Sequence, residues 1–280
     1  MQSMRRASGR QHLDWPESLY PCRNTMIDSH VHLDDDQYDD RDGLIKRAYD
    51  AGVTAAVVPG VSKESNRRVL ELSAEYPDFV RPALGMHPEY PHAGESDIAD
   101  TLALLDAKRG SICAVGEVGL PWYGEVSNRP GAQENAEAML ARFARAAADL
   151  DLALILHCPH RTAARALALI RSAGVRRAVF HWHKSDDATT RAIIEAGYFV
   201  SLTPEVVYRE RDQAMATLAP LESLMVETDG PWPYGGPFAG RRTEPSMVAE
   251  AVAAIARIKG ESERAVADAT TENARILFGI

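Results

Sequence analysis

The sequence predicts an α/β fold, a (β/α)8 barrel of the TIM type. From Met26 onward, short apolar runs alternate with longer amphipathic stretches, which gives eight strand–helix units. Most of the short runs are apolar throughout, as is typical of parallel strands that are covered on both faces. No change in composition divides the units, and the 280 residues suit a barrel, which uses about 250. We therefore expect one domain over residues 26–280.

An open, doubly wound sheet is the alternative arrangement of such units. That fold binds phosphates with a glycine-rich loop after its first strand. Here the first strand leads into Ser29-His30-Val31-His32, which contains no glycine. The barrel is therefore the favoured fold. The strands that we expect in it are Met26–Ser29, Thr54–Val58, Phe79–Leu84, Ile112–Gly116, Ala153–Leu156, Ala178–Phe180, Tyr198–Ser201 and Leu224–Val226.

The helices between these strands are recognised from their amphipathic pattern and from their ends. Four of them stop at a glycine, which readily adopts the left-handed conformation of a C-terminal cap, and another stops at Pro77. The expected helices are Asp42–Ala51, Ser62–Tyr76, Asp97–Lys108, Gln133–Leu150, Arg161–Ala173, Asp187–Ala196, Glu210–Leu218 and Glu244–Lys259, and then a closing pair, Ser262–Ala269 and Thr271–Phe278.

The composition limits the classes of partner. With 31 basic and 40 acidic side chains the formal net charge is −9, so the surface as a whole repels a polyphosphate backbone, and a broad nucleic-acid footprint is not expected. A nucleic-acid substrate is still compatible with this charge, because metal ions in a pocket supply positive charge locally. No apolar run approaches the ~18 residues of a membrane span, and no feature indicates an obligate protein partner.

We expect a cytoplasmic protein with an N-terminal extension. The three cysteines, Cys22, Cys113 and Cys158, have no framework spacing, which fits a reducing compartment. Residues 1–25 are polar and lack the apolar core of a signal peptide. We interpret them as a disordered extension or as the product of an upstream start codon, since Met26 follows.

Potential metal ligands follow five of the expected strands, where a barrel builds its active site. His30 and His32 come after the first strand, and their i, i+2 spacing on extended backbone points both imidazoles to one side. A lone histidine at a strand end is usually a surface residue, and a lone aspartate there usually caps a helix. Six such residues at one rim favour a single metal site instead. The ligand candidates after the other four strands are Glu117, His157, His181 and Asp229.

Five motifs in order carry a resemblance to a known family. They are IDSHVHLD, GEVGL, ILHCPH, FHWHKSD and ETDGPWPYGG, and the closing TTENARILFG belongs with them. Each motif alone is weakly specific, but their order and spacing together are highly specific. The chain resembles the TatD family of metal-dependent hydrolases, within the amidohydrolase superfamily, over essentially all of residues 26–280.

The resemblance implies a site with two divalent metal ions and a deoxyribonuclease activity that acts from an exposed strand end. Mixed imidazole and carboxylate ligands suit Zn²⁺, Mn²⁺ or Mg²⁺. The strand-eight aspartate can also accept the proton of the attacking water. The implied ligands are His30, His32 and Asp229 for one ion, His157 and His181 for the other, and Glu117 as a bridge between them.

Three positions depart from the family's pattern. Pro121 stands where GE-x-GL is commonly followed by aspartate, and Cys158-Pro159 replaces a common Ser-Arg whose arginine suits a phosphate contact. If Arg161 cannot reach the pocket, a phosphate-binding element is missing. Trp182-His183 replaces Cys-Phe, and His183 or Lys184 can supply the lost positive charge. Alternatively, His183 lies on the surface or supports a metal ligand without contacting the substrate.

Further candidates for substrate contacts lie on the rim loops. The resemblance places a substrate-contacting histidine at His87, and a loop histidine bonded to backbone is the alternative. Aromatic residues on the rim can stack on unpaired bases or form the wall of a small-molecule pocket. A hydrolase of a small ester, amide or lactone, or an inactive metal-binding accessory protein, are the alternative functions. These aromatic residues are Trp122, Tyr123, Trp182, Trp232 and Tyr234.

Overall fold

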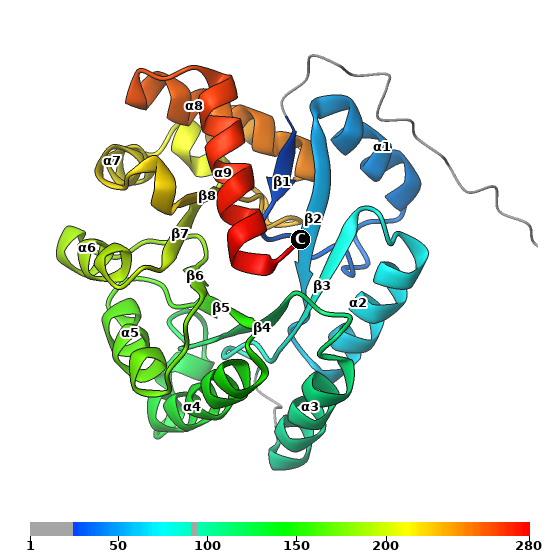
Figure 1. The fold of residues 1–280 in the computed structure, drawn as a ribbon, viewed down its shortest axis with the longest axis vertical. Helices are drawn as coiled ribbons and strands as arrows, with labels where there is room; N and C mark the ends of the chain where they lie inside the picture. The colour runs from blue at the N-terminus through cyan, green and yellow to red at the C-terminus, as the bar shows by residue number, and fades with distance from the viewer. Residues whose placement is uncertain (1–24, 91–93) are drawn as a thin grey trace, which may run out of the picture.

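Eight parallel strands in sequence order form the sheet of the molecule (Figure 1). The structure, a computed structural model, describes residues 25–90 and 94–280. A backbone hydrogen bond from Ser29 N to Val226 O, 3.0 Å long, joins the end of the first strand to the last. This closes the predicted barrel. The strands are β1 (Met26–Asp28), β2 (Val53–Pro59), β3 (Val80–Leu84), β4 (Ala114–Gly119), β5 (Ala153–His157), β6 (Ala178–Phe180), β7 (Phe199–Leu202) and β8 (Leu224–Val226).

Helices surround the barrel and cover the outer faces of its strands. The predicted glycine caps are present: Gly52 and Gly260 end helices in the left-handed conformation. At the start of α2, the Ser62 hydroxyl accepts the Ser65 amide. The helices are α1 (Arg41–Ala51), α2 (Lys63–Glu75), α3 (Glu95–Lys108), α4 (Ala132–Leu150), α5 (Thr162–Ser172), α6 (Asp187–Glu195), α7 (Glu210–Leu218), α8 (Val248–Lys259) and α9 (Glu263–Phe278).

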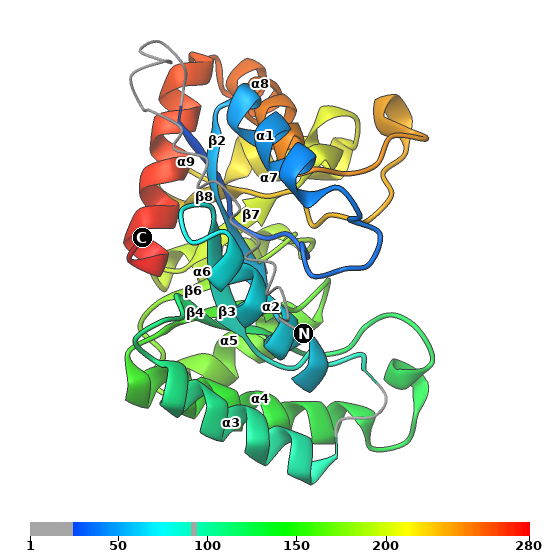
Figure 2. The same cartoon turned by 90° about the vertical axis from the view of Figure 1, so that its right-hand side faces the viewer.

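The barrel is filled by apolar side chains and is closed at one end by α9. Val57, Ile155 and Met225 form an inner core together with Leu277 and Phe278 of α9, while other strand residues pack in a larger core with the surrounding helices. Because the strands are buried on both faces, their sequences are apolar at nearly every position. Figure 2 shows α9 along one side of the molecule and the loops that follow the strands extending to the opposite side.

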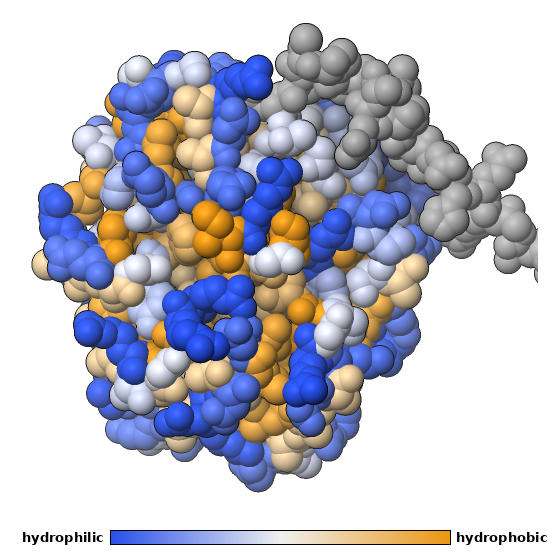
Figure 3. Space-filling view, in the orientation of Figure 1, coloured by the Kyte–Doolittle hydropathy of each residue, from blue (hydrophilic) through white to orange (hydrophobic). Residues whose placement is uncertain are grey.

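The face that α9 crosses is largely hydrophilic. Figure 3 shows hydrophilic side chains over much of this face, with smaller groups of hydrophobic ones between them. Such a pattern is expected where a helix buries one side in the core and exposes the other. None of the helices in the described ranges is long and apolar enough to cross a membrane.

Two sequence expectations are corrected by the structure. The fourth strand is Ala114–Gly119 and not Ile112–Gly116, because Val118 and Gly119 pair with β5. The closing pair of helices is one helix, α9. Its interior Thr270 bonds its hydroxyl to Val266 O, 2.9 Å away, so the threonine pair does not interrupt it. The expected N-terminal extension lies outside the described residues, except for Thr25.

Candidate metal centre

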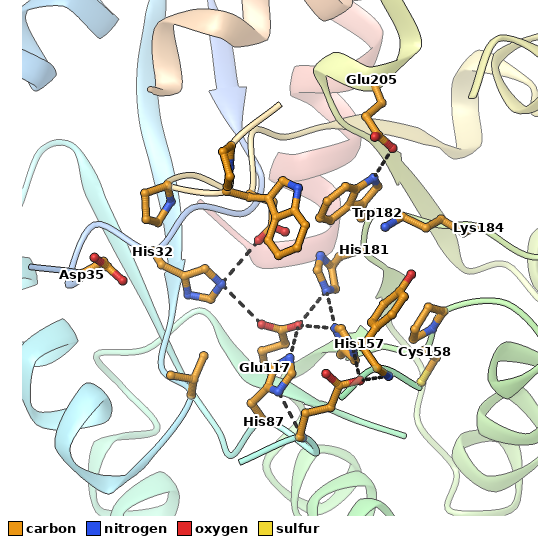
Figure 4. Close-up of a pocket in the computed structure, with 18 of the residues that line it drawn as sticks. His32, Asp35, His87, Glu117, His157, Cys158, His181, Trp182, Lys184 and Glu205 are labelled. Atoms are coloured by element: carbon orange, nitrogen blue, oxygen red, sulfur yellow. Dashed lines mark hydrogen bonds and ion pairs between the residues drawn. The ribbon is translucent and has the colours of Figure 1, made fainter. Parts of the chain in front are cut away.

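The six predicted ligands gather at the end of the barrel opposite α9, around a pocket of about 760 Å³ (Figure 4). Two follow β1, Glu117 lies within β4, His157 ends β5, and the other two follow β6 and β8. Glu117 was expected after its strand, so it lies deeper in the barrel than predicted. It is buried, and His30 lies buried beside it.

Glu117 stands at the centre of the site with its two carboxylate oxygens facing different histidines. Its Oε2 lies 3.3 Å from His30 Nε2 and 3.5 Å from His32 Nε2. Its Oε1 lies 2.6 Å from His181 Nε2 and 3.1 Å from His157 Nδ1. The carboxylate therefore divides the imidazoles into two groups, one on each oxygen.

Asp229 completes the first of these groups. Its Oδ1 lies 3.5 Å from His30 Nε2 and 3.4 Å from His32 Nε2. The backbone of Asp229 has a positive φ of 47°, and its amide donates to His30 O at 2.8 Å. The loops after β1 and β8 are thereby joined, and this connection holds the aspartate against the two histidines.

His87, predicted as a substrate contact, lies among the ligand candidates. Its Nε2 is 3.5 Å from Glu117 Oε1. With Glu117 and His157 it forms a group whose ligand atoms all lie within 4.8 Å of one another. The second half of the site therefore offers three imidazoles, and not only the two that the resemblance implies.

The close glycines of β4 make this geometry sterically feasible. A Cβ on Gly119 would lie 1.9 Å from His157 O, and one on Gly116 would lie 2.6 Å from Ile155 Cβ. Both distances are far below a normal van der Waals contact. The strands that carry Glu117 and His157 can approach each other only because these positions lack side chains.

The charges of the site are coupled. Burial would raise the pKa of Glu117, but His181, His87 and His30 outweigh it and hold this pKa well below its usual range. Burial would lower the pKa of His32, but the Asp229 and Glu117 carboxylates raise it to about 9. In the metal-free protein, protons on histidines therefore balance the buried carboxylates.

A divalent cation fits this donor set. Five imidazoles and two carboxylates converge, and in the described part of the chain no lysine or arginine pairs with Glu117 or Asp229. Buried carboxylates need a positive partner, and mixed nitrogen and oxygen ligands are those of zinc, manganese and related ions. The residues present thus form groups of nitrogen and oxygen donors that could hold a metal ion.

Carboxylates behind the ligands orient them, and the sequence analysis did not identify these residues. Glu227 is buried, with Oε1 3.4 Å from His181 Nδ1, and it also accepts the Trp182 amide and the Ser201 hydroxyl. Asp28 accepts the His30 amide at 3.2 Å. Such partners fix the orientation of ligating histidines. The available signal was an acidic residue at the end of two apolar runs, Asp28 as the last residue of β1 and Glu227 directly after β8.

Two further contacts orient the remaining histidines. His32 Nδ1 lies 3.3 Å from Pro59 O, which directs its Nε2 into the site. Glu89 Oε1 accepts the Trp122 and Tyr123 amides at 2.8 and 2.7 Å and lies 3.4 Å from His157 Nε2. Glu89 therefore connects the β4–α4 loop to the second half of the site.

The structure does not bring the other two predicted substrate contacts to the pocket. Arg161 is exposed and stacks on Trp122, with its Cζ 4.4 Å from the ring centroid. His183 is buried, and its Nε2 lies 2.9 Å from Thr190 Oγ1 in α6. Neither residue lines the pocket, whereas Lys184 does.

Three of the five predicted rim aromatics line the pocket, Tyr123, Trp182 and Trp232. Tyr234 is buried beneath them and donates its hydroxyl to Thr228 O at 2.7 Å. Trp122 lies outside the pocket lining, under Arg161. The exposed Tyr90 also lines the pocket, so aromatic side chains from several loops border it.

Comparison with known proteins identifies the family. The family model described as TatD related DNase matches residues 27–279. The chain belongs to the TatD family of metal-dependent hydrolases. It is 30% identical over 262 residues to the mouse protein named putative deoxyribonuclease TATDN3, covering 90% of this chain and 88% of that one. It is 29% identical to the 3'-5' ssDNA/RNA exonuclease TatD of Erwinia tasmaniensis, covering 91% of this chain and 100% of that one.

A solved structure agrees with this assignment. The TatD homologue YjjV of Escherichia coli superposes with a TM-score of 0.83 at 26% identity, covering 91% of this chain and 98% of that one. The resemblance predicted from the motifs is therefore confirmed, and the TIM-type barrel with it.

Proposed function

We propose that this TatD-family protein is a two-metal phosphodiesterase that acts as a deoxyribonuclease on exposed DNA ends. The observation that supports it best is the division of the site by Glu117, whose two oxygens face separate groups of histidines. A carboxylate placed in this way is suited to bridge two ions. His30, His32 and Asp229 would hold one ion, and His157 and His181, with His87 close by, the other.

Divalent ions bound there, Mg²⁺, Mn²⁺ or Zn²⁺, would activate water and stabilise the negative charge that develops on the leaving oxygen. The chain's own residues supply the rest. The Asp229 carboxylate, whose pKa is lowered because the histidines around it outweigh its burial, stays ionised and accepts the proton of the attacking water. Glu227 keeps the His181 imidazole oriented, and Asp28 fixes the backbone at His30.

The surroundings of the pocket support a single-stranded nucleic acid as the substrate. Tyr90, Tyr123 and Trp232 line the pocket with exposed fractions of 50%, 40% and 53%. Exposed aromatic faces stack on unpaired bases without regard to sequence. The Erwinia relative is named a 3'-5' ssDNA/RNA exonuclease, and its match to this chain covers 100% of that relative.

The test is hydrolysis of end-labelled, single-stranded oligonucleotides by the purified protein with Mg²⁺, Mn²⁺ or Zn²⁺, together with the metal content of the protein. We expect stepwise shortening from one end, two equivalents of metal, and loss of activity with a chelator. Absence of shortening from either end under every metal would overturn the proposal.

Hydrolysis of a small ester, amide or lactone is the second candidate. Two observations favour it: Arg161 lies outside the pocket, and the pocket volume of about 760 Å³ is that of a small-molecule site. A panel of such substrates, tested beside the oligonucleotides, separates the two functions. An inactive accessory role is less well supported, because every predicted ligand is present at the site.

We place the protein in a reducing compartment, the cytoplasm, and expect DNA or another phosphoester as its partner. Cys113 and Cys158 are free and buried, which suits such a compartment. Detection of the protein in fractionated cells is the corresponding measurement.

A further inference from the structure

Lys184 lies in the wall of the pocket, three residues after His181. Its Nζ is 3.2 Å from the centroid of the Trp182 ring and 5.6 Å from that of Tyr123. Figure 4 shows this ammonium group pointing into the pocket, beside Trp182 and on the side of His181. The two rings come from different loops, so the lysine is framed by aromatic faces next to the metal centre.

The other basic residues that line the pocket have carboxylate partners. Arg209 and Arg211 pair with Glu205 at 3.1 and 2.6 Å, and Arg68 pairs with an aspartate of the β1–α1 loop at 3.0 Å. Lys184 makes no ion pair with any residue in the described ranges, although it lines the same pocket. Its positive charge is therefore available to a ligand.

Lys184 is also partly removed from water. Burial and the nearby Arg211 lower the pKa of its ammonium to about 8. A desolvated charge without a partner is unfavourable, and an anion in the pocket would relieve this cost. Attraction between the Lys184 ammonium and the face of the Trp182 ring compensates for this cost only in part.

We propose that Lys184 binds a phosphate oxygen of the substrate beside the metal centre. The inference rests on the proposed phosphoester substrate, and it deepens that proposal by naming the group that recognises the phosphate. Arg161, the predicted phosphate contact, is held on the outer side of Trp122. The loop after β6 would thus supply the cation that the loop after β5 does not.

Binding of inorganic phosphate to the Mg²⁺-loaded protein tests this directly, by calorimetry. Lys184→Met removes the charge and keeps most of the apolar stem. We expect phosphate to bind roughly tenfold more weakly, as for loss of a charge-assisted hydrogen bond. Lys184→Gln should behave in the same way. Lys108→Met, which removes the same charge from the exposed end of α3, should leave phosphate binding unchanged.

Chromogenic substrates separate phosphate recognition from general damage. For bis(4-nitrophenyl) phosphate we expect Lys184→Met to raise KM about tenfold and to change kcat much less. Hydrolysis of the neutral 4-nitrophenyl acetate should be unaffected. Phosphate binding within about twofold of wild type, in a variant with an unchanged Tm, would overturn the role of Lys184. If the wild type hydrolyses no phosphoester, the proposed function fails, and the calorimetry still decides the role of Lys184.

Discussion

At the scale of single residues, the candidate site contains charges that the metal-free protein balances with protons. Among the residues that the structure describes, Glu117 and Asp229 form ion pairs only with histidines. Both carboxylates keep a lowered pKa in spite of burial. An arrangement of this kind is prepared for a cation that takes the place of the protons.

Asp229→Asn separates the role of a ligand from that of a proton acceptor. The amide keeps an oxygen but is a far weaker base, so we expect kcat to fall about 10²-fold or more while KM changes much less. Metal analysis should still find the ion on the side of His157 and His181. A fall of less than about tenfold with full metal occupancy would make Asp229 a spectator, and His87 would be the next base to test.

Glu117→Gln tests whether this side chain bridges two metal ions. The variant keeps the shape of the side chain but loses the charge that two cations would share. We expect the metal content to fall from two equivalents to one or fewer, with loss of most activity. The circular dichroism spectrum should be unchanged, because the apolar core of the barrel does not include this residue. Two retained equivalents would contradict the bridging role.

Ion binding should also depend on pH, since the ligating histidines must lose their protons. The pKa of His32 is raised to about 9, and that of His181 is raised as well by Glu117 and Glu227 in spite of burial. Both groups carry protons at neutral pH in the metal-free protein. We expect metal affinity to rise with pH up to about 9 and binding at pH 7 to release protons. Calorimetry in buffers of different ionisation enthalpy measures this proton release. If no protons were released, the coupling between metal binding and histidine deprotonation would be contradicted.

At the scale of elements, the sequence predicts most of the fold because each strand is covered on both faces. The eight apolar runs and the glycine caps are strong local signals, and they place the ligands at the correct end of the barrel. The end of β4 was not predictable in this way, because Gly116, Glu117 and Gly119 are poor strand formers, and the strand continues only because Val118 and Gly119 pair with β5. The positions of Arg161 and His183 depend on loop conformation, which has no comparable periodic signal.

Helix α9 contributes to stability through the residues that enter the barrel. Phe278 is 5% exposed and packs in the inner core, whereas Ile276 is 57% exposed. We expect Phe278→Ala to lower the free energy of unfolding by about 3–5 kcal/mol and Ile276→Ala to change it by less than about 0.5 kcal/mol. Urea unfolding measures both. Equal effects would show that the end of α9 is not part of the core.

At the scale of the whole molecule, the net charge of −9 would confine the proposed nucleic-acid binding to the neighbourhood of the pocket. The arginines of the pocket wall are paired with carboxylates, so few cations are available to phosphates. Each phosphate contact contributes about −0.7 to the slope of log affinity against log salt for a single strand. We expect a slope no steeper than about −1.4, measured by fluorescence anisotropy. A steeper slope would reveal a basic footprint elsewhere.

The packing of α9 into the barrel also determines how a substrate can enter the pocket and how products can leave it. Leu277 and Phe278 fill the end opposite the metal ligands, and the barrel interior is a packed core and not a channel. A polymer therefore cannot be threaded through this protein. Under the proposed function, the strand end would enter the pocket from the open side, and the shortened strand and the released product would both leave by that same opening before the next nucleotide is bound.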